Sequence, residues 1–260
     1  MLKLNAYQLK LIAIIGMISS HIVIAWWEII PTWLAFPMYI AGGMTFPIMS
    51  YFVAQGYKHT SNYKKYVSRV LLFGLLALPF HVLTITLPMA GMTFSYPFLN
   101  IMFNIAVGLW VLRLYERMKS RVLFWLLFVV VIAPLSLVLL EWYIVGVAMV
   151  LMGHIIKNET LARIVPSLFA AACFALLGLW VAGMTTQTGS AQFLAYTNTL
   201  PLLMNYEFVP VQQSFAIGMV IAAFLLAGYT GERGKQSKWL FYIVYPGHFV
   251  VLWLGMLLIG

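Results

Sequence analysis

A lysine and a histidine in the first apolar segment are the residues of this chain best placed to do chemistry. Lys10 and His21 lie eleven positions apart, which on an α-helix is about three turns, or about 16 Å along one face. An ionisable group inside a bilayer costs enough free energy that it is usually kept there for a function. Imidazole is the side chain suited to proton transfer near neutral pH. His21 is therefore a functional candidate, and the alternative is a histidine that only hydrogen-bonds a neighbouring helix.

Five further polar side chains are predicted to lie at membrane depth on other helices. His81 follows a proline, and its alternative role is to cap the helix break there. Asn100 and Asn104 could instead join helices, and Glu141 could lie among lipid headgroups. His248 follows Pro-Gly near the middle of the last segment. The sequence has no glycine-rich phosphate loop, nucleophile elbow or zinc-like Cys/His spacing, so we expect no metal. Proton transfer, transport and scaffolding stay open as functions.

The composition indicates a polytopic membrane protein. The chain has 260 residues, of which 63% are hydrophobic and 8% charged, whereas soluble domains carry about 25% charged residues. The net charge of +9 does not indicate nucleic-acid binding, because the basic residues form short clusters between apolar segments, as membrane orientation requires. We expect a single all-α domain over residues 1–260, embedded as a multi-pass bundle in the lipid bilayer of the cytoplasmic (inner) membrane.

Nine apolar segments have the length of a membrane span, which is about 20 residues. They are predicted at 8–27, 33–55, 67–87, 97–115, 122–139, 141–156, 164–184, 210–229 and 239–258. With nine spans, all fifteen Lys and Arg residues fall on one side, so the positive-inside rule predicts a cytoplasmic N-terminus and a C-terminus outside. On this topology the polar side chains lie in the outer half or middle of the bilayer, as an outward-opening polar cavity requires.

The chain resembles the TraX family of membrane acetyltransferases, which is related to the acyltransferase-3 superfamily. Lys10 and His21 fit the superfamily pattern of Arg or Lys, ten residues and His. The other stretches that carry the resemblance are Phe46-Pro47-Ile48, Gln55–Thr60, Tyr66–Arg69, Leu78-Pro79-Phe80, Phe98–Ile101, Tyr143–Gly146 and Tyr245–His248.

The resemblance implies that the chain moves an acetyl group from cytoplasmic acetyl-CoA to an amine or hydroxyl of an acceptor. The acceptor would be a pilin N-terminus or a cell-surface glycan. His21 would be the general base, a role worth about 10²–10⁴-fold in rate. Lys10, with Lys58 and Arg69 from the basic loop after the second segment, would bind the CoA phosphates.

One position departs from the family pattern. Ser20 stands where the family usually has Asp, so a neutral hydroxyl replaces the carboxylate that would support the imidazole as a base. Ser20 and Glu141 are predicted to complete the catalytic group, with Glu141 taking the place of the Asp if the fold brings it near His21. Two other functions stay open: a small polar-solute transporter or flippase, and a catalytically inactive interaction protein.

Overall fold

Every segment predicted from hydropathy is helical in the part of the chain that the structure describes. The computed structural model describes residues 2–26, 28–87, 99–186, 208–235 and 238–259, and these contain no β-strand. The α-helices are α1 Ala6–Ala25, α2 Thr32–Gly43, α3 Thr45–His59, α4 Tyr63–His81, α6 Ile101–Arg117, α7 Arg121–Leu127, α8 Ala133–Leu139, α9 Tyr143–Ile155, α10 Glu159–Thr186, α13 Phe208–Ala227 and α14 Lys238–Ile259, and the π-helices are η1 Val82–Thr86 and η2 Phe128–Ile132. The all-α class is confirmed.

Five stretches within these helices are long and apolar enough to cross a membrane. They are Ala6–Ala25, Tyr63–Thr86, Arg121–Leu139, Glu159–Leu176 and Trp239–Ile259. The apolar helices Tyr143–Ile155 and Ser214–Ala227 are shorter. The chain therefore has the character of a membrane protein, while nine spans and the orientation of the termini stay predictions.

The segment predicted as one helix at 33–55 is two helices in the structure. α2 ends at Gly43, Met44 forms the junction, and α3 begins at Thr45. Pro47 has no N–H to donate to the carbonyl of Gly43, so the helical hydrogen-bond ladder is interrupted at this point. The break lies beside the middle of α1, where the Thr45 hydroxyl donates to the carbonyl oxygen of Ala13 at 3.0 Å.

Glycines allow α1, α2 and α13 to pack with their backbones in close contact. A Cβ added to Gly16 of α1 would lie 2.1 Å from the carbonyl oxygen of Ala41 in α2, and one added to Gly218 of α13 would lie 1.9 Å from the carbonyl oxygen of Ile40. Small residues at helix interfaces are how membrane helices approach closely when lipid supplies no hydrophobic drive. These contacts fix α1, which carries Lys10 and His21, against its neighbours.

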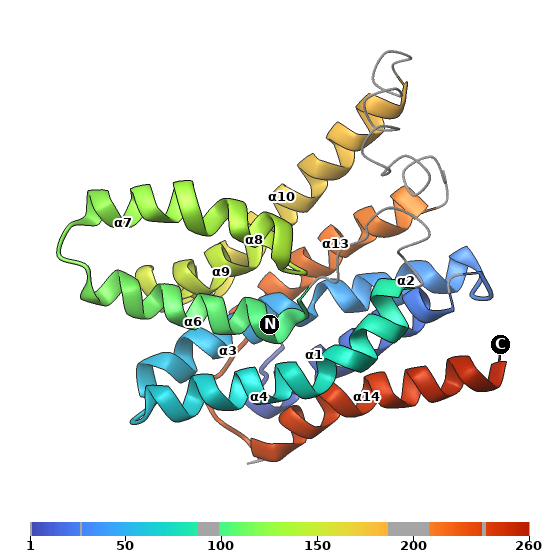
Figure 1. Ribbon diagram of the computed structural model, residues 1–260, viewed down its shortest axis with the longest axis horizontal. Helices are drawn as coiled ribbons and strands as arrows, with labels where there is room; N and C mark the ends of the chain where they lie inside the picture. The colour runs from blue at the N-terminus through green and yellow to red at the C-terminus, as the bar shows by residue number, and fades with distance from the viewer. Residues whose placement is uncertain (1, 27, 88–98, 187–207, 236–237, 260) are drawn as a thin grey trace.

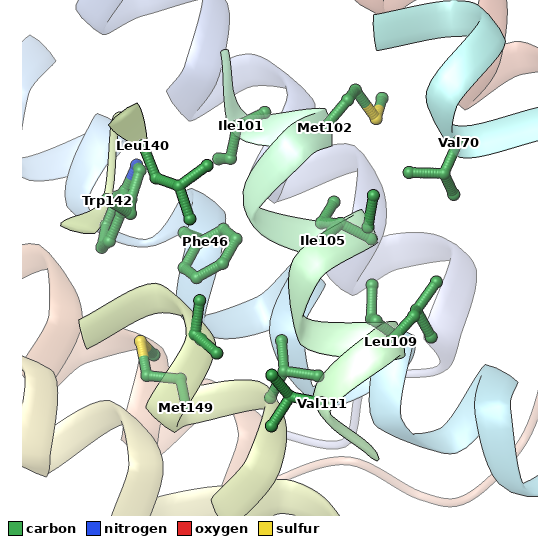
Figure 2. Packing of buried hydrophobic residues seen from close by; sticks show 14 of the residues in the cluster. Phe46, Val70, Ile101, Met102, Ile105, Leu109, Val111, Leu140, Trp142 and Met149 are labelled. Atoms are coloured by element: carbon green, nitrogen blue, oxygen red, sulfur yellow. The ribbon is translucent and has the colours of Figure 1, made fainter. Parts of the chain in front are cut away.

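A buried apolar cluster joins the helices on the other side of α1. Figure 2 shows Phe46 of α3, Ile105 and Leu109 of α6, and Met149 of α9 packed together, with Trp142 at the start of α9 beside them. Phe46 and Leu109 are completely buried. This cluster holds α3, α6 and α9 as one unit.

The two ends of the bundle differ in their basic residues. Figure 1 shows the α3–α4 and α6–α7 turns at one end, and the α1–α2 turn and the C-terminal end of α14 at the other. The first end holds the basic residues of both turns, including Lys58, Lys64, Lys65, Arg117, Lys119 and Arg121. We call it the basic end of the bundle.

The glycine contact between α13 and α2 generates a stability prediction. Gly218→Ala should lower the thermal unfolding midpoint of the detergent-solubilised protein, because overpacking of this kind costs about 1–3 kcal/mol. Gly247→Ala in α14 is the matched control: nothing lies within 4 Å of an added Cβ there, and Ala is favoured over Gly in a helix by about 1 kcal/mol. Equal midpoints for the two variants would contradict the close packing.

Candidate functional site

Two histidines from opposite ends of the chain form a hydrogen-bonded pair in the protein interior. Nδ1 of His21 in α1 lies 2.8 Å from Nε2 of His248 in α14. The rings are nearly parallel, with centroids 5.0 Å apart and an interplanar angle of 10°. Each residue is only 7% exposed, and Phe249 stacks on His21 at 5.0 Å. The pair is therefore buried, with its geometry limited by the hydrogen bond and by the ring of Phe249.

The hydrogen bonds of the pair determine where its protons lie. Nδ1 of His248 is 3.1 Å from the carbonyl oxygen of Val244, which only accepts, so this nitrogen carries a proton. In a neutral His248 the Nε2 atom then has the lone pair, and His21 must donate to it from Nδ1. Nε2 of a neutral His21 is left with a free lone pair. The structure therefore orients His21 as a proton acceptor through Nε2.

Ser20 does not contact the ring of His21. Its hydroxyl donates to the carbonyl oxygen of Met17 at 3.0 Å within the same helix. Its side chain packs on α2, where a Cβ added to Gly42 would lie 2.4 Å from the Cβ of Ser20. The role that the structure gives to Ser20 is helix packing, and His248 has the place beside His21 that a carboxylate was expected to hold.

Glu141 reaches a different histidine from the one expected. Its Oε2 atom lies 3.7 Å from Nε2 of His81, and His81 packs edge-on against Phe249 at 5.2 Å. Oε2 of Glu141 and both ring nitrogens of His81 are buried and have no hydrogen-bond partner in the described part of the chain. Phe249 thus separates two polar groups, the pair His21–His248 and the pair His81–Glu141.

Asn100 and Asn104 join helices and position backbone. Asn100 begins α6 by accepting the N–H of Met102 at 3.1 Å and donates to the carbonyl oxygen of Gly74 in α4 at 2.9 Å. Asn104 accepts the N–H of Trp142 at 3.0 Å and donates to the carbonyl oxygen of Tyr143 at 3.1 Å. Both side chains are completely buried. Of the two interpretations of these asparagines, a functional site or contacts between helices, these hydrogen bonds support contacts between helices.

A cavity of about 680 Å³ begins at the basic end and runs along α1. On α1 its lining follows one face through Lys10, Ala13, Ile14 and Met17, as the helical spacing of Lys10 and His21 predicts. It ends one helical turn before His21. Tyr245, one turn before His248 on α14, closes the same inner end.

Four basic residues line this cavity toward the basic end of the bundle. They are Lys10, Arg163, Arg233 and Lys235, with His59 and Glu159 nearby in the lining. Lys10 lies over the rings of Phe52 and Phe241, at 4.9 and 5.4 Å, and has no ion pair in the described residues. The cavity therefore has a cationic mouth, which suits an anionic ligand.

Only one of the predicted phosphate-binding residues lines the cavity. Lys58 donates to the carbonyl oxygen of Gly153 at 3.4 Å, and Arg69 lies over the ring of Tyr242 at 5.9 Å; neither lines it, nor do His81, Asn100, Asn104 and His248. The sequence did not single out Arg163, Arg233 or Lys235, because the orientation rule already explained every basic loop residue.

Hydrogen bonds to the N-terminus hold the loop that carries Arg233 and Lys235. Leu4 donates to the carbonyl oxygen of Gly228 at 3.1 Å and accepts from Thr230 at 2.9 Å. Ala6 donates to the carbonyl oxygen of Glu232 at 2.9 Å. Gly234 has a φ of +67° and packs on Asn5, a backbone conformation that glycine adopts without strain. This loop and the start of α1 form one rim of the cavity.

Comparison with known proteins places the chain in a family. The family model described as TraX protein matches residues 5–255. A probable fimbrial assembly protein, FimC of serogroup H1 from Dichelobacter nodosus, is 26% identical over 254 residues, which cover 95% of this chain and 94% of the relative. None of the solved structures compared with the chain matches it. The match over nearly the whole chain, together with the helical fold, shows that this protein belongs to the TraX family.

Proposed function

We propose that this protein is a membrane acetyltransferase that moves an acetyl group from acetyl-CoA to an amine or hydroxyl of an acceptor. One observation carries the proposal: a cavity with a cationic mouth runs along α1 and ends one helical turn before a buried pair of imidazoles. The phosphates of CoA suit the mouth, and the amine or hydroxyl that attacks the thioester needs a proton acceptor at the far end. The proposal includes a place in the wider acyltransferase-3 superfamily.

The cationic mouth supports an anionic donor that enters from the cytoplasm. Lys10, Arg163, Arg233 and Lys235 come from α1, α10 and the α13–α14 loop. Arg163 is partly committed, since it pairs with Glu159 at 3.4 Å and donates to the carbonyl oxygen of Tyr229 at 2.9 Å. Lys10 lacks such a partner and is the cation nearest to the imidazoles along α1. We assign it to the donor phosphate closest to the reacting group.

His21 supplies the base in the proposed reaction. The nucleophile of the acceptor attacks the thioester carbonyl carbon while its proton moves to Nε2 of His21. The carbon–sulfur bond breaks, and the CoA thiolate takes that proton from the imidazolium, so that free CoA and the acetylated acceptor leave. His248 keeps His21 in the required tautomer and orientation, which is the task a carboxylate performs in many histidine bases. Ser20 in place of Asp is compatible with this chemistry.

The acceptor side of the proposal draws on the relative. The Dichelobacter nodosus protein is named as a probable fimbrial assembly protein, and pilin is a fimbrial subunit. We therefore place this protein in the inner membrane, with a pilin N-terminus as the first acceptor to test and a cell-surface glycan as the second.

The direct test uses purified protein in lipid vesicles with acetyl-CoA radiolabelled in the acetyl group. The proposal expects release of free CoA and label on added pilin or glycan. Transport of label into the vesicles without release of CoA would instead support a small-solute transporter. Neither release nor transport, with pilin and glycan both supplied, would leave an interaction protein.

Replacing each imidazole separates the base from the residue that orients it. His21→Gln should reduce the transfer rate by about 10²-fold or more, because Gln keeps hydrogen-bonding capacity but cannot take the proton. His248→Gln should reduce kcat by a smaller factor, because His21 keeps its basic nitrogen and loses its fixed orientation. Steady-state rates with a thermal unfolding control check both. A parent-like rate in His21→Gln would remove this residue from the mechanism.

The donor assignment predicts a difference between two lysines at the same end of the bundle. Lys10→Ala should weaken acetyl-CoA binding, and added salt should weaken binding to the parent protein, since part of the attraction is ionic. Lys64→Ala is the matched control, because Lys64 is exposed at the start of α4 and does not line the cavity. Isothermal titration in detergent measures both affinities. Equal affinities for the two variants would move the phosphate site elsewhere.

A further inference from the structure

The inner end of the cavity holds a hydroxyl that the protein itself does not use. Tyr245 lines the cavity and is 3% exposed, yet its hydroxyl is buried without a hydrogen-bond partner in the described residues. A buried hydroxyl left unpaired costs about 1–3 kcal/mol. An unpaired hydroxyl on a residue that lines a binding cavity therefore indicates a partner on the ligand.

The ring of Tyr245 is fixed next to the imidazole pair. It lies one helical turn before His248 on α14, with ring centroids 5.6 Å apart, and packs edge-on against Phe249 at 5.5 Å. A ligand that extends along the cavity therefore meets Tyr245 where the cavity comes nearest to the imidazoles.

A backbone amide faces the same place. Ile101 is the first residue of α6 and also lines the cavity, and its backbone amide approaches the Tyr245 hydroxyl. The Asn100 side chain takes the N–H of Met102, whereas the N–H of Ile101 is directed to the Tyr245 hydroxyl oxygen and to the Glu141 carboxylate. The Ile101 N–H is therefore turned to groups of the protein, and the Tyr245 hydroxyl hydrogen is the donor left for an oxygen that gains negative charge.

We infer that Tyr245 is a catalytic residue that donates a hydrogen bond to the carbonyl oxygen of the bound thioester. The inference rests on the proposed acetyl transfer. As the acceptor nucleophile bonds to the carbonyl carbon, the carbonyl π electrons move to the oxygen, and the Tyr245 hydroxyl stabilises this oxyanion. When the carbon–oxygen double bond re-forms, the carbon–sulfur bond breaks and the thiolate leaves with the proton from His21. Tyr245 keeps its own proton throughout.

Glu141 is the other group that this hydroxyl could serve. The carboxylate of Glu141 acts electrostatically on Tyr245 and also approaches Ile101, but no hydrogen bond joins it to the hydroxyl. Glu141 does not line the cavity, and its Oε2 atom is directed to His81 at 3.7 Å. Glu141 therefore leaves the Tyr245 hydroxyl without a hydrogen-bond partner.

The test compares acetyl-CoA with CoA, because only acetyl-CoA has the carbonyl oxygen. Tyr245→Phe removes one oxygen atom and keeps the ring. We expect the ratio of acetyl-CoA affinity to CoA affinity to fall several-fold, CoA affinity to stay unchanged, and kcat to fall by about 10²-fold, as for the loss of one oxyanion donor. The thermal unfolding midpoint should not fall, because the hydroxyl makes no bond in the protein.

Two further variants separate the possible outcomes. Tyr39→Phe is the control, since Tyr39 is also buried but does not line the cavity, and it should leave the affinity ratio and kcat at the parent values. Glu141→Gln should leave the affinity ratio unchanged. If Glu141→Gln lowers the ratio as much as Tyr245→Phe does, and the double variant lowers it no more than either single variant, the hydroxyl acts through Glu141 and the inference is overturned. A parent-like Tyr245→Phe in an active protein overturns the inference alone, whereas a parent that neither binds nor uses acetyl-CoA overturns the proposed function as well.

Discussion

The hydrogen bond between His21 and His248 is the interaction on which the rest of the site depends. It joins the first helix to the last in an apolar interior, where an unpaired polar group would cost about 1–3 kcal/mol. The bond at 2.8 Å forms only when α1 and α14 lie in one register. The close packing of α1 on α2 through Gly16 and the stacking of Phe249 on His21 limit that register from two sides. Because of this bond, the packing of α1 against α14 determines which nitrogen of the His21 ring carries the proton.

Charged and neutral side chains line different parts of the cavity. The cations Lys10, Arg163, Arg233 and Lys235 lie toward the basic end, while the inner end is closed by Met17 and the neutral Tyr245. This order keeps charged side chains where water can solvate them, since a charge at membrane depth is costly. It also gives an elongated ligand one direction, with its anionic part at the mouth and its reactive part near the imidazoles. The same separation explains how one small protein can combine an ionic binding site with a base that works while uncharged.

The sequence predicted the helices far better than the contacts between them. Among the described residues hydropathy located the helical segments, because long apolar runs are what a bilayer selects. It did not predict the junction at Met44, where Pro47 interrupts the ladder, or the π-helical stretches Val82–Thr86 and Phe128–Ile132. Spacing placed Lys10 and His21 on one face of α1 correctly. The partner of His21 was not predictable, because His248 lies 227 positions away and no local pattern determines which helices meet. Its mid-depth position after Pro-Gly was the available signal. For the same reason the sequence could not determine whether the fold brings Glu141 near His21, and in the structure Glu141 lies beside His81.

The central claim is that His248 fixes His21 as a neutral base with its lone pair on Nε2. Nitrogen-15 NMR of histidine-labelled protein in lipid bilayers tests it most directly, with His21→Gln and His248→Gln used to assign the two signals. The account predicts that both rings are neutral and protonated on Nδ1, and that the Nδ1 proton of His21 shows coupling across the hydrogen bond to Nε2 of His248. A His21 ring protonated on Nε2, or on both nitrogens, at neutral pH would contradict it.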